Sequence, residues 1–179
     1  MSAQSLTAPP VEQRHQGNAA GADFGTRVHA CWEEITWLNA PLPSWFNQPA
    51  TDEQKVVAAA LQQPEIAALF TRRPGQEVYN EQPLEAITDK NEWLSGTIDR
   101  LVLTVDAGGT PTAAHIIDFK TNQLDPTKEE SYDALKAEYL PQMTEYRKHV
   151  AKALNLPESA VAASLLSCPL GIKARIVPC

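Results

Sequence analysis

Two segments of the sequence place acidic side chains in apolar, strand-like surroundings. Asp99 lies within residues 95–100 (SGTIDR), and Asp118 lies with Lys120 within residues 116–121 (IIDFKT). Aspartate is disfavoured inside strands, so each position needs a specific reason. Side chains alternate along a strand, which puts Asp118 and Lys120 on one face, and an antiparallel hairpin would bring Asp99 beside them. The competing interpretation is an ion pair at the exposed edge of a sheet.

The combination of two carboxylates and a lysine is suited to metal-dependent hydrolysis. Two carboxylates that lie together repel each other unless a cation lies between them. Oxygen ligands favour Mg²⁺ or Mn²⁺ over zinc. A lysine two residues from a metal-binding aspartate can orient or help to deprotonate an attacking water, and it can offset charge on a phosphate.

Three further residues could add to this site. His29 and Glu33 are four residues apart on a predicted helix and therefore share a face, and imidazole is a common metal ligand. Glu81 lies on a predicted strand that should neighbour the strand of Asp99. The alternatives are an ordinary His–Glu pair on a helix surface and a glutamate that faces solvent.

A polar and aromatic stripe follows on a later predicted helix. Gln142 and Tyr146 are four residues apart, and Tyr139 lies one turn before Gln142. A glutamine amide and a tyrosine hydroxyl can form hydrogen bonds with phosphate oxygens or with a catalytic carboxylate. The alternative is an amphipathic helix whose tyrosines belong to the core.

The elements that must position these residues alternate between helices and strands. Apolar periodicity and capping signals predict helices at residues 24–38, after Thr51 (with Gln54 as a capping box), at 64–70 and at 130–154. β-Favouring residues predict strands at 76–88, 92–106 and 112–120 before the last helix, and at 160–168 and 172–177 after it. Residues 107–110 (AGGT) predict a hairpin turn, and Pro141 predicts a break in the long helix. This order predicts a mixed α/β fold with a central mixed sheet of about five strands flanked by helices.

Length and composition narrow the class of protein. The 179 residues suffice for one domain, with residues 1–23 expected to be a flexible tail or linker. The net charge of −7 argues against coating nucleic acid by bulk charge, although basic residues could act locally (Arg100, Arg147, Lys148, Lys152). We expect no membrane partner and no secretory signal, because no apolar run is long enough. Three widely spaced cysteines suggest a cytoplasmic location.

The ordered set of motifs resembles a known family. Residues 24–179 resemble the RecB/AddA-type nuclease domain of the PD-(D/E)xK superfamily, through Gly25-x-x-x-His29, Glu33, Glu81, Gly96-x-Ile98-Asp99, Ile117-Asp118-Phe119-Lys120-Thr121 and Gln142-x-x-x-Tyr146. The resemblance implies a restriction-endonuclease-like core. Ile98 stands where the superfamily name has proline.

The resemblance also implies roles for individual residues. Asp99 and Asp118 would be metal ligands, His29 would add a ligand, and the backbone carbonyl of Phe119 would be an extra one. Lys120 would position or activate the nucleophilic water. Gln142 and Tyr146, with Tyr139, would position the substrate, and Glu33 and Glu81 would be additional acidic residues.

The activity implied is Mg²⁺- or Mn²⁺-dependent hydrolysis of phosphodiester bonds in DNA. We expect an exonuclease in DNA repair or recombination related to helicase–nuclease complexes. The chain has no P-loop of its own, so it is an excised domain, works alone, or works with a separate helicase subunit. Three dispersed cysteines cannot hold an iron–sulfur cluster, so none is expected. The alternatives are a catalytically silent scaffold of a helicase–nuclease complex, and a hydrolase of small phosphoesters.

Overall fold

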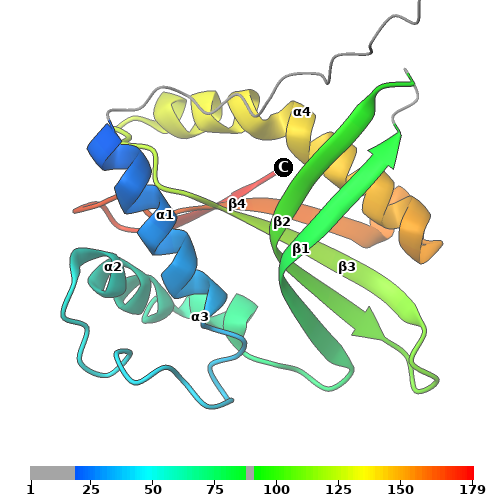
Figure 1. Ribbon diagram of the computed structural model, residues 1–179, viewed down its shortest axis with the longest axis horizontal. Helices are drawn as coiled ribbons and strands as arrows, with labels where there is room; N and C mark the ends of the chain where they lie inside the picture. The colour runs from blue at the N-terminus through cyan, green and yellow to red at the C-terminus, as the bar shows by residue number, and fades with distance from the viewer. Residues whose placement is uncertain (1–18, 88–90) are drawn as a thin grey trace, which may run out of the picture.

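A five-stranded mixed sheet forms the centre of the protein (Figure 1). The computed structural model of the chain describes residues 19–87 and 91–179. The strands are β1 (Gln76–Ile87), β2 (Trp93–Val105), β3 (Pro111–Lys120), β4 (Val161–Ser167) and β5 (Arg175–Pro178), in the spatial order β1-β2-β3-β4-β5. All neighbours are antiparallel except β3 and β4, which are parallel. The predicted fold class is confirmed.

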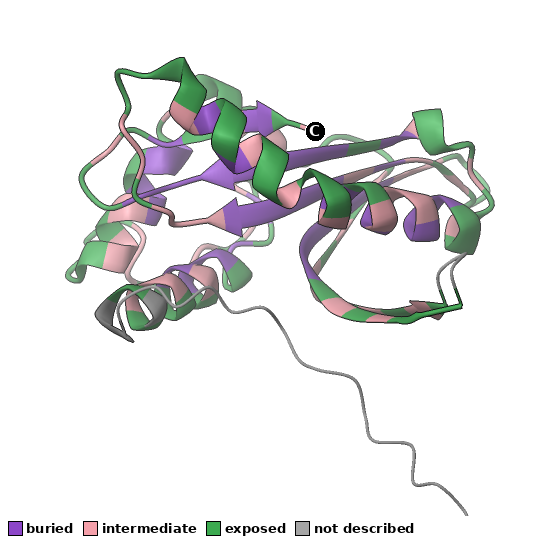
Figure 2. Cartoon of the chain, turned by 90° about the horizontal axis from the view of Figure 1, so that it is seen from above, coloured by how far each residue is buried: buried purple, intermediate pink, exposed green. Residues whose placement is uncertain are grey.

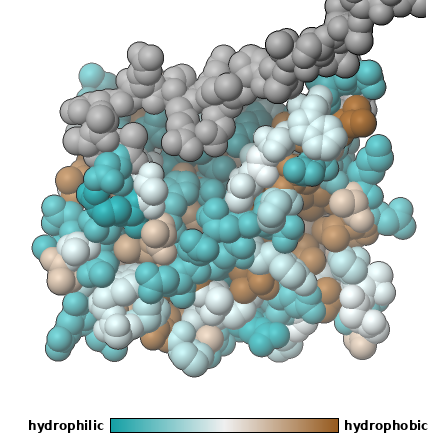
Figure 3. Space-filling view, viewed as in Figure 1, coloured by the Kyte–Doolittle hydropathy of each residue, from teal (hydrophilic) through white to brown (hydrophobic). Residues whose placement is uncertain are grey.

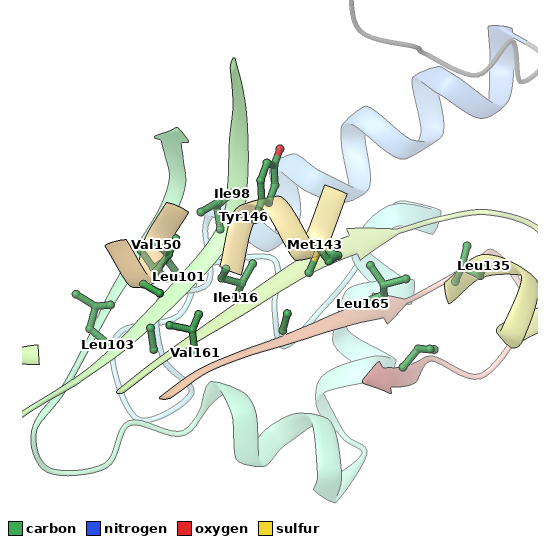
Figure 4. Packing of buried hydrophobic residues seen from close by; sticks show 14 of the residues in the cluster. Ile98, Leu101, Leu103, Ile116, Leu135, Met143, Tyr146, Val150, Val161 and Leu165 are labelled. Carbon is green, nitrogen blue, oxygen red and sulfur yellow. The ribbon is translucent and has the colours of Figure 1, made fainter. Parts of the chain in front are cut away.

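Helices cover both faces of this sheet. They are α1 (Ala19–Glu33), α2 (Asp52–Leu61), α3 (Pro64–Phe70) and α4 (Glu129–Leu154), with a 3-10 turn at Glu158–Ala160. Ile116 of β3 packs with α4, whereas the next residue, Ile117, packs with α1, α2 and α3, as the alternation of side chains along a strand requires. Figure 4 shows the core on the α4 side, and Figure 2 shows that α4 turns exposed residues outward from the buried strands.

The first helix begins earlier and ends earlier than predicted. It starts at Ala19, so the last part of the expected tail is helical, while residues 1–18 and Thr88 of the first predicted strand lie outside the described residues. It stops at Glu33, although the apolar periodicity continues to Leu38. The periodicity continues because Ile35, in the turn that follows, is fully buried in the same core.

The prediction of a break at Pro141 was wrong. Helix α4 continues through Pro141 without interruption. Proline inside a helix costs about 3 kcal/mol, but both halves of α4 contribute to one core. Tyr132 and Leu135 before the proline, and Met143 and Val150 after it, are buried there, and each such side chain stabilises the fold by roughly 1.5–3 kcal/mol. Packing therefore outweighs the lost hydrogen bond.

The β1–β2 hairpin is longer than the rest of the sheet. Its strands pair as far as Ile87 and Trp93, whereas β2 pairs with β3 only from Arg100 onward. Residues 93–99 of β2 therefore form an arm with β1 that rises past α4 in Figure 1. The predicted turn at residues 107–110 is confirmed, because Asp106 Oδ1 accepts hydrogen bonds from the N–H groups of Gly108 and Thr110.

Hydrophilic side chains predominate on the face shown in Figure 3, with some apolar side chains exposed among them. None of the helices in the described part of the chain is both long enough and apolar enough to cross a membrane.

Candidate metal centre

The strands β2 and β3 separate at Asp99. Their ladder ends with the pair Arg100 and Ile117. Beyond it, the backbone N–H of Phe119 donates a hydrogen bond of 2.6 Å to Asp99 Oδ2. The carboxylate thus replaces a backbone carbonyl as acceptor, which explains how an aspartate that is only 8% exposed is accommodated inside a strand.

Three side chains from three elements converge at this fork. His29 of α1, Glu81 of β1 and Asp99 of β2 each offer a ligand atom, and these atoms lie within 4.8 Å of one another. His29 Nδ1 is 3.6 Å from Asp99 Oδ1. Among residues 19–87 and 91–179, these three residues form the one group of three or more potential metal ligands that lie this close together. The predicted proximity of His29 to Asp99 is therefore present in the structure.

Glu81 holds a more central place than the sequence suggested. It lies between the bridge pairs Asn80–Arg100 and Gln82–Ile98, which places it opposite Asp99. Its φ of 51° is left-handed, a conformation that costs on the order of 1–3 kcal/mol for a residue other than glycine. Burial, followed by the charge of Asp99, raises the pKa of Glu81. A strained backbone that gathers like charges is typical of a binding site.

His29 bridges two of the predicted ligand groups. Its Nε2 lies 3.0 Å from the carbonyl oxygen of Phe119, and since a carbonyl only accepts, Nε2 carries the proton in this contact. Burial lowers the pKa of His29, but the hydrogen bond and charge of Asp99 outweigh burial and leave the pKa raised. The raised pKa favours the positively charged form of the imidazole beside the acidic fork.

Asp118 lies beside this group, outside the 4.8 Å limit. It is 2% exposed, and its Oδ2 forms an ion pair with Lys120 Nζ but accepts no hydrogen bond of regular geometry from the described residues. Burial and the Asp99 charge raise the pKa of Asp118 to about 6, with Lys120 and His29 acting in the opposite direction. Burial lowers the pKa of Lys120, but the charge and hydrogen bond of Asp118, together with the charge of Asp99, outweigh burial and leave the pKa raised.

These residues fit a hard divalent cation. The available donors are carboxylate oxygens, a backbone carbonyl and one imidazole, which is a donor set for Mg²⁺ or Mn²⁺ rather than for zinc. At Asp118 the Lys120 ammonium group already contacts the buried Oδ2, so a metal ion would share this carboxylate with the lysine.

Tyr139 lies against the lysine of the centre. Lys120 Nζ is 4.1 Å from the centroid of the Tyr139 ring. A cation over the face of an aromatic ring is stabilised by about 0.5–2 kcal/mol. Tyr139, predicted to contact substrate, thus contacts Lys120 in this structure and restricts where the ammonium group can lie.

Gln142 and Tyr146 connect α4 to the β1–β2 arm. Gln142 Nε2 donates to the Tyr146 hydroxyl at 2.9 Å, and that hydroxyl donates to the carbonyl of Thr97 at 3.4 Å. The Tyr146 ring is buried beside Ile98 in the core (Figure 4). Gly96 permits this contact, since a Cβ there would collide with the Tyr146 hydroxyl. The pair therefore holds the arm next to Asp99.

The remaining candidates lie further from the cluster. Glu33 is exposed at the end of α1, and its charge acts on Glu81 from outside the three-residue group. Arg100 is fully buried, so the expectation that it supplies charge to a substrate was wrong. Gly25 lets α1 approach β3 closely, because a Cβ there would lie 3.0 Å from Thr121 Oγ1.

Sequence comparison identifies the family. A search of curated proteins found no significant match. The sequence model of the PD-(D/E)XK nuclease superfamily matches residues 4–175, which include every residue of the centre described above. The match spans nearly the whole chain, and the mixed sheet flanked by helices agrees with it. The chain therefore belongs to the PD-(D/E)XK nuclease superfamily.

Proposed function

We propose that this protein is a Mg²⁺- or Mn²⁺-dependent deoxyribonuclease of the RecB/AddA type. The observation that carries the proposal is the convergence of His29, Glu81 and Asp99 at the fork between β2 and β3. Beside them lies the ion pair of buried Asp118 and half-buried Lys120. A fold that only needed stability would not concentrate buried like charges at one point.

The residues of the centre would have two different roles, metal binding and orientation of the water. Asp99, Asp118, Glu81 and His29, with the Phe119 carbonyl, would hold the ion. A bound divalent ion supplies positive charge for the phosphate and lowers the pKa of water. Lys120 has a raised pKa, which supports a role as a cation that orients water and balances phosphate charge at neutral pH.

We further propose that the substrate is DNA and that cleavage proceeds from ends, in a repair process that involves a separate helicase. The family membership supports a nuclease, and the resemblance of the motifs to RecB/AddA domains supports the finer assignment. Tyr146 and Gln142 would hold the arm, and Tyr139 would hold Lys120, while the strand is cleaved.

Cleavage assays on linear and circular DNA test the proposal. Wild-type protein should degrade linear DNA with Mg²⁺ or Mn²⁺, spare closed circles and be inactive in EDTA. Asp99→Asn, Asp118→Asn and Lys120→Met should each lose at least about 100-fold in rate, as removal of a group that stabilises the transition state does. Lys173→Ala is the matched control, because this lysine is 76% exposed and pairs with Glu65 of α3 rather than with a residue of the centre.

Three outcomes contradict parts of the proposal. Equal cleavage by wild type and the three variants would end it. Cleavage of circles would replace the exonuclease with an endonuclease. Binding of DNA without any cleavage, in a protein that also binds no Mn²⁺, would favour the silent scaffold.

A further inference from the structure

Arg100 follows a proposed metal ligand in the chain, yet its side chain is fully buried. The guanidinium lies between the rings of Trp37 and Phe70, at 4.9 Å and 4.2 Å from their centroids. Burial lowers the pKa of Arg100 to about 9, so the group stays cationic at neutral pH. Within residues 19–87 and 91–179, no carboxylate lies in ion-pair contact with it. A buried charge is costly, so its presence in an apolar core calls for a geometric explanation.

The Arg100 guanidinium binds the turn that follows α1. One terminal nitrogen donates to the carbonyl of Ile35 at 2.9 Å, and the other donates to the carbonyl of Thr36 at 2.6 Å. Ile35 and Thr36 lie two and three residues beyond Glu33, the last residue of α1. A cation near this end of the helix is also favoured by the helix dipole. Arg100 therefore anchors the turn that follows α1.

Asn80 completes this arrangement from the neighbouring strand. It is the cross-strand partner of Arg100, and its Oδ1 accepts a hydrogen bond of 3.2 Å from the guanidinium. Its Nδ2 donates to the carbonyl groups of Glu33 at 2.9 Å and Ile35 at 3.3 Å. Two adjacent strands thus hold the same short stretch of backbone.

We propose that Asn80 and Arg100 are positioning residues that set the distance of His29 from Asp99 and Glu81. Asn80 directly precedes Glu81, and Arg100 directly follows Asp99. Asn80 binds the carbonyl group of Glu33, and His29 lies one helical turn (about 5.4 Å) before Glu33 along α1. The pair that anchors α1 is therefore joined by single peptide units to both acids that His29 must meet.

Metal sites tolerate only small errors in the positions of their ligands, so the anchoring of α1 should affect metal affinity. Ligand distances must lie within about 0.2 Å of their preferred values, and loss of an outer partner of a ligand commonly lowers metal affinity about 10–100-fold. The role in metal binding rests on the proposed function, whereas the placement of His29 does not require a metal.

A double-mutant cycle on Mn²⁺ affinity tests the role at the metal. Asn80 is only half-buried, so Asn80→Ala should fold, and it should lower Mn²⁺ affinity by about tenfold in calorimetry. In the His29→Ala background the same substitution should cost less than about twofold, because its effect passes through His29. Val150→Ala is the control, since it removes buried core on the α4 side of the sheet and should leave Mn²⁺ affinity unchanged. An equal loss in both backgrounds, or no loss, overturns this role.

Proton NMR of the histidine rings tests the placement without metal. The His29 ring meets Phe119 edge-on at 5.9 Å between centroids, so ring currents make its resonances sensitive to small movements. Asn80→Ala and Arg100→Lys, which loses the planar fork, should shift the His29 signals. The signals of His149, which lies in α4 on the other face of the sheet, should stay in place. Unmoved His29 signals in both variants refute the inference. If wild-type protein binds no Mn²⁺, the proposed function fails, and the His29 signals still decide the placement.

Discussion

The buried carboxylate of Asp118 should destabilise the metal-free protein at neutral pH. Its pKa rises from an ordinary value of 3.8 to about 6, mainly through burial and the charge of Asp99. One unit corresponds to about 1.4 kcal/mol, so the ionised group costs about 3 kcal/mol of unfolding free energy relative to a neutral group of the same shape. The attraction of Lys120 is already included in that raised pKa.

The sign of the pH dependence follows from proton binding. Because the pKa is higher in the folded state, the folded protein binds more protons than the unfolded chain between about pH 4 and pH 6. The contribution of Asp118 to stability therefore falls as pH rises through this window and is constant above it. Asp118→Asn removes the charge, so it should be more stable than wild type at pH 8, by up to about 3 kcal/mol, and no more stable at pH 4.

Thermal unfolding in EDTA at pH 4 and pH 8 measures this difference. For a chain of this size, about 3 kcal/mol corresponds to a Tm increase of roughly 6–12 °C. Asp133→Asn makes the same chemical change at an exposed position of α4 and should alter stability by less than about 0.5 kcal/mol. Added Mn²⁺ should stabilise the wild type and leave Asp118→Asn unchanged. A variant no more stable than wild type at pH 8, or equally stabilised at both pH values, would refute the electrostatic reasoning.

Three further predictions concern the neighbours of the centre. Gly96→Ala should lower the free energy of unfolding by about 1–3 kcal/mol, because its methyl group meets the Tyr146 hydroxyl, and Tyr146→Phe in the same chain should recover part of the loss in urea unfolding. Tyr139→Leu should slow DNA cleavage with little change in Mn²⁺ affinity, while Tyr139→Phe keeps the ring beside Lys120 and most of the rate; equal rates for both variants would contradict this. Glu81→Gly should raise the free energy of unfolding, because glycine adopts a positive φ without strain. The same variant should bind Mn²⁺ more weakly in calorimetry, and an unchanged Mn²⁺ affinity would show that Glu81 is not a ligand.

Local patterns were sufficient to predict the strands and the place of the two aspartates. Alternating β-favouring residues and a glycine-rich turn define the β2–β3 hairpin, and an aspartate in such a strand needs a partner nearby. Asp99 finds that partner in the N–H of Phe119 and in His29. The signal was visible because the residue type conflicts with its local surroundings.

Features that depend on long-range packing were not visible in the sequence. The direct opposition of Glu81 and Asp99 depends on the register of β1 and β2 and on a left-handed φ that no local pattern announces. Arg100 was expected to supply local positive charge, and its burial was not foreseen, since arginine is rarely buried without a charged partner. Asn80 was missed altogether, although asparagine inside a strand is as unusual as aspartate and could have drawn attention.

The parallel pairing of β3 with β4 has a consequence for the growing chain on the ribosome. The acids and the lysine all precede α4, but β3 gains its neighbour on that side only when residues 161–167 have been made. Contacts between distant parts of a chain form late in folding. A nascent polypeptide would thus carry the reactive groups without the strand that completes their sheet, which would keep the proposed cleavage silent until residues 161–167 have been made.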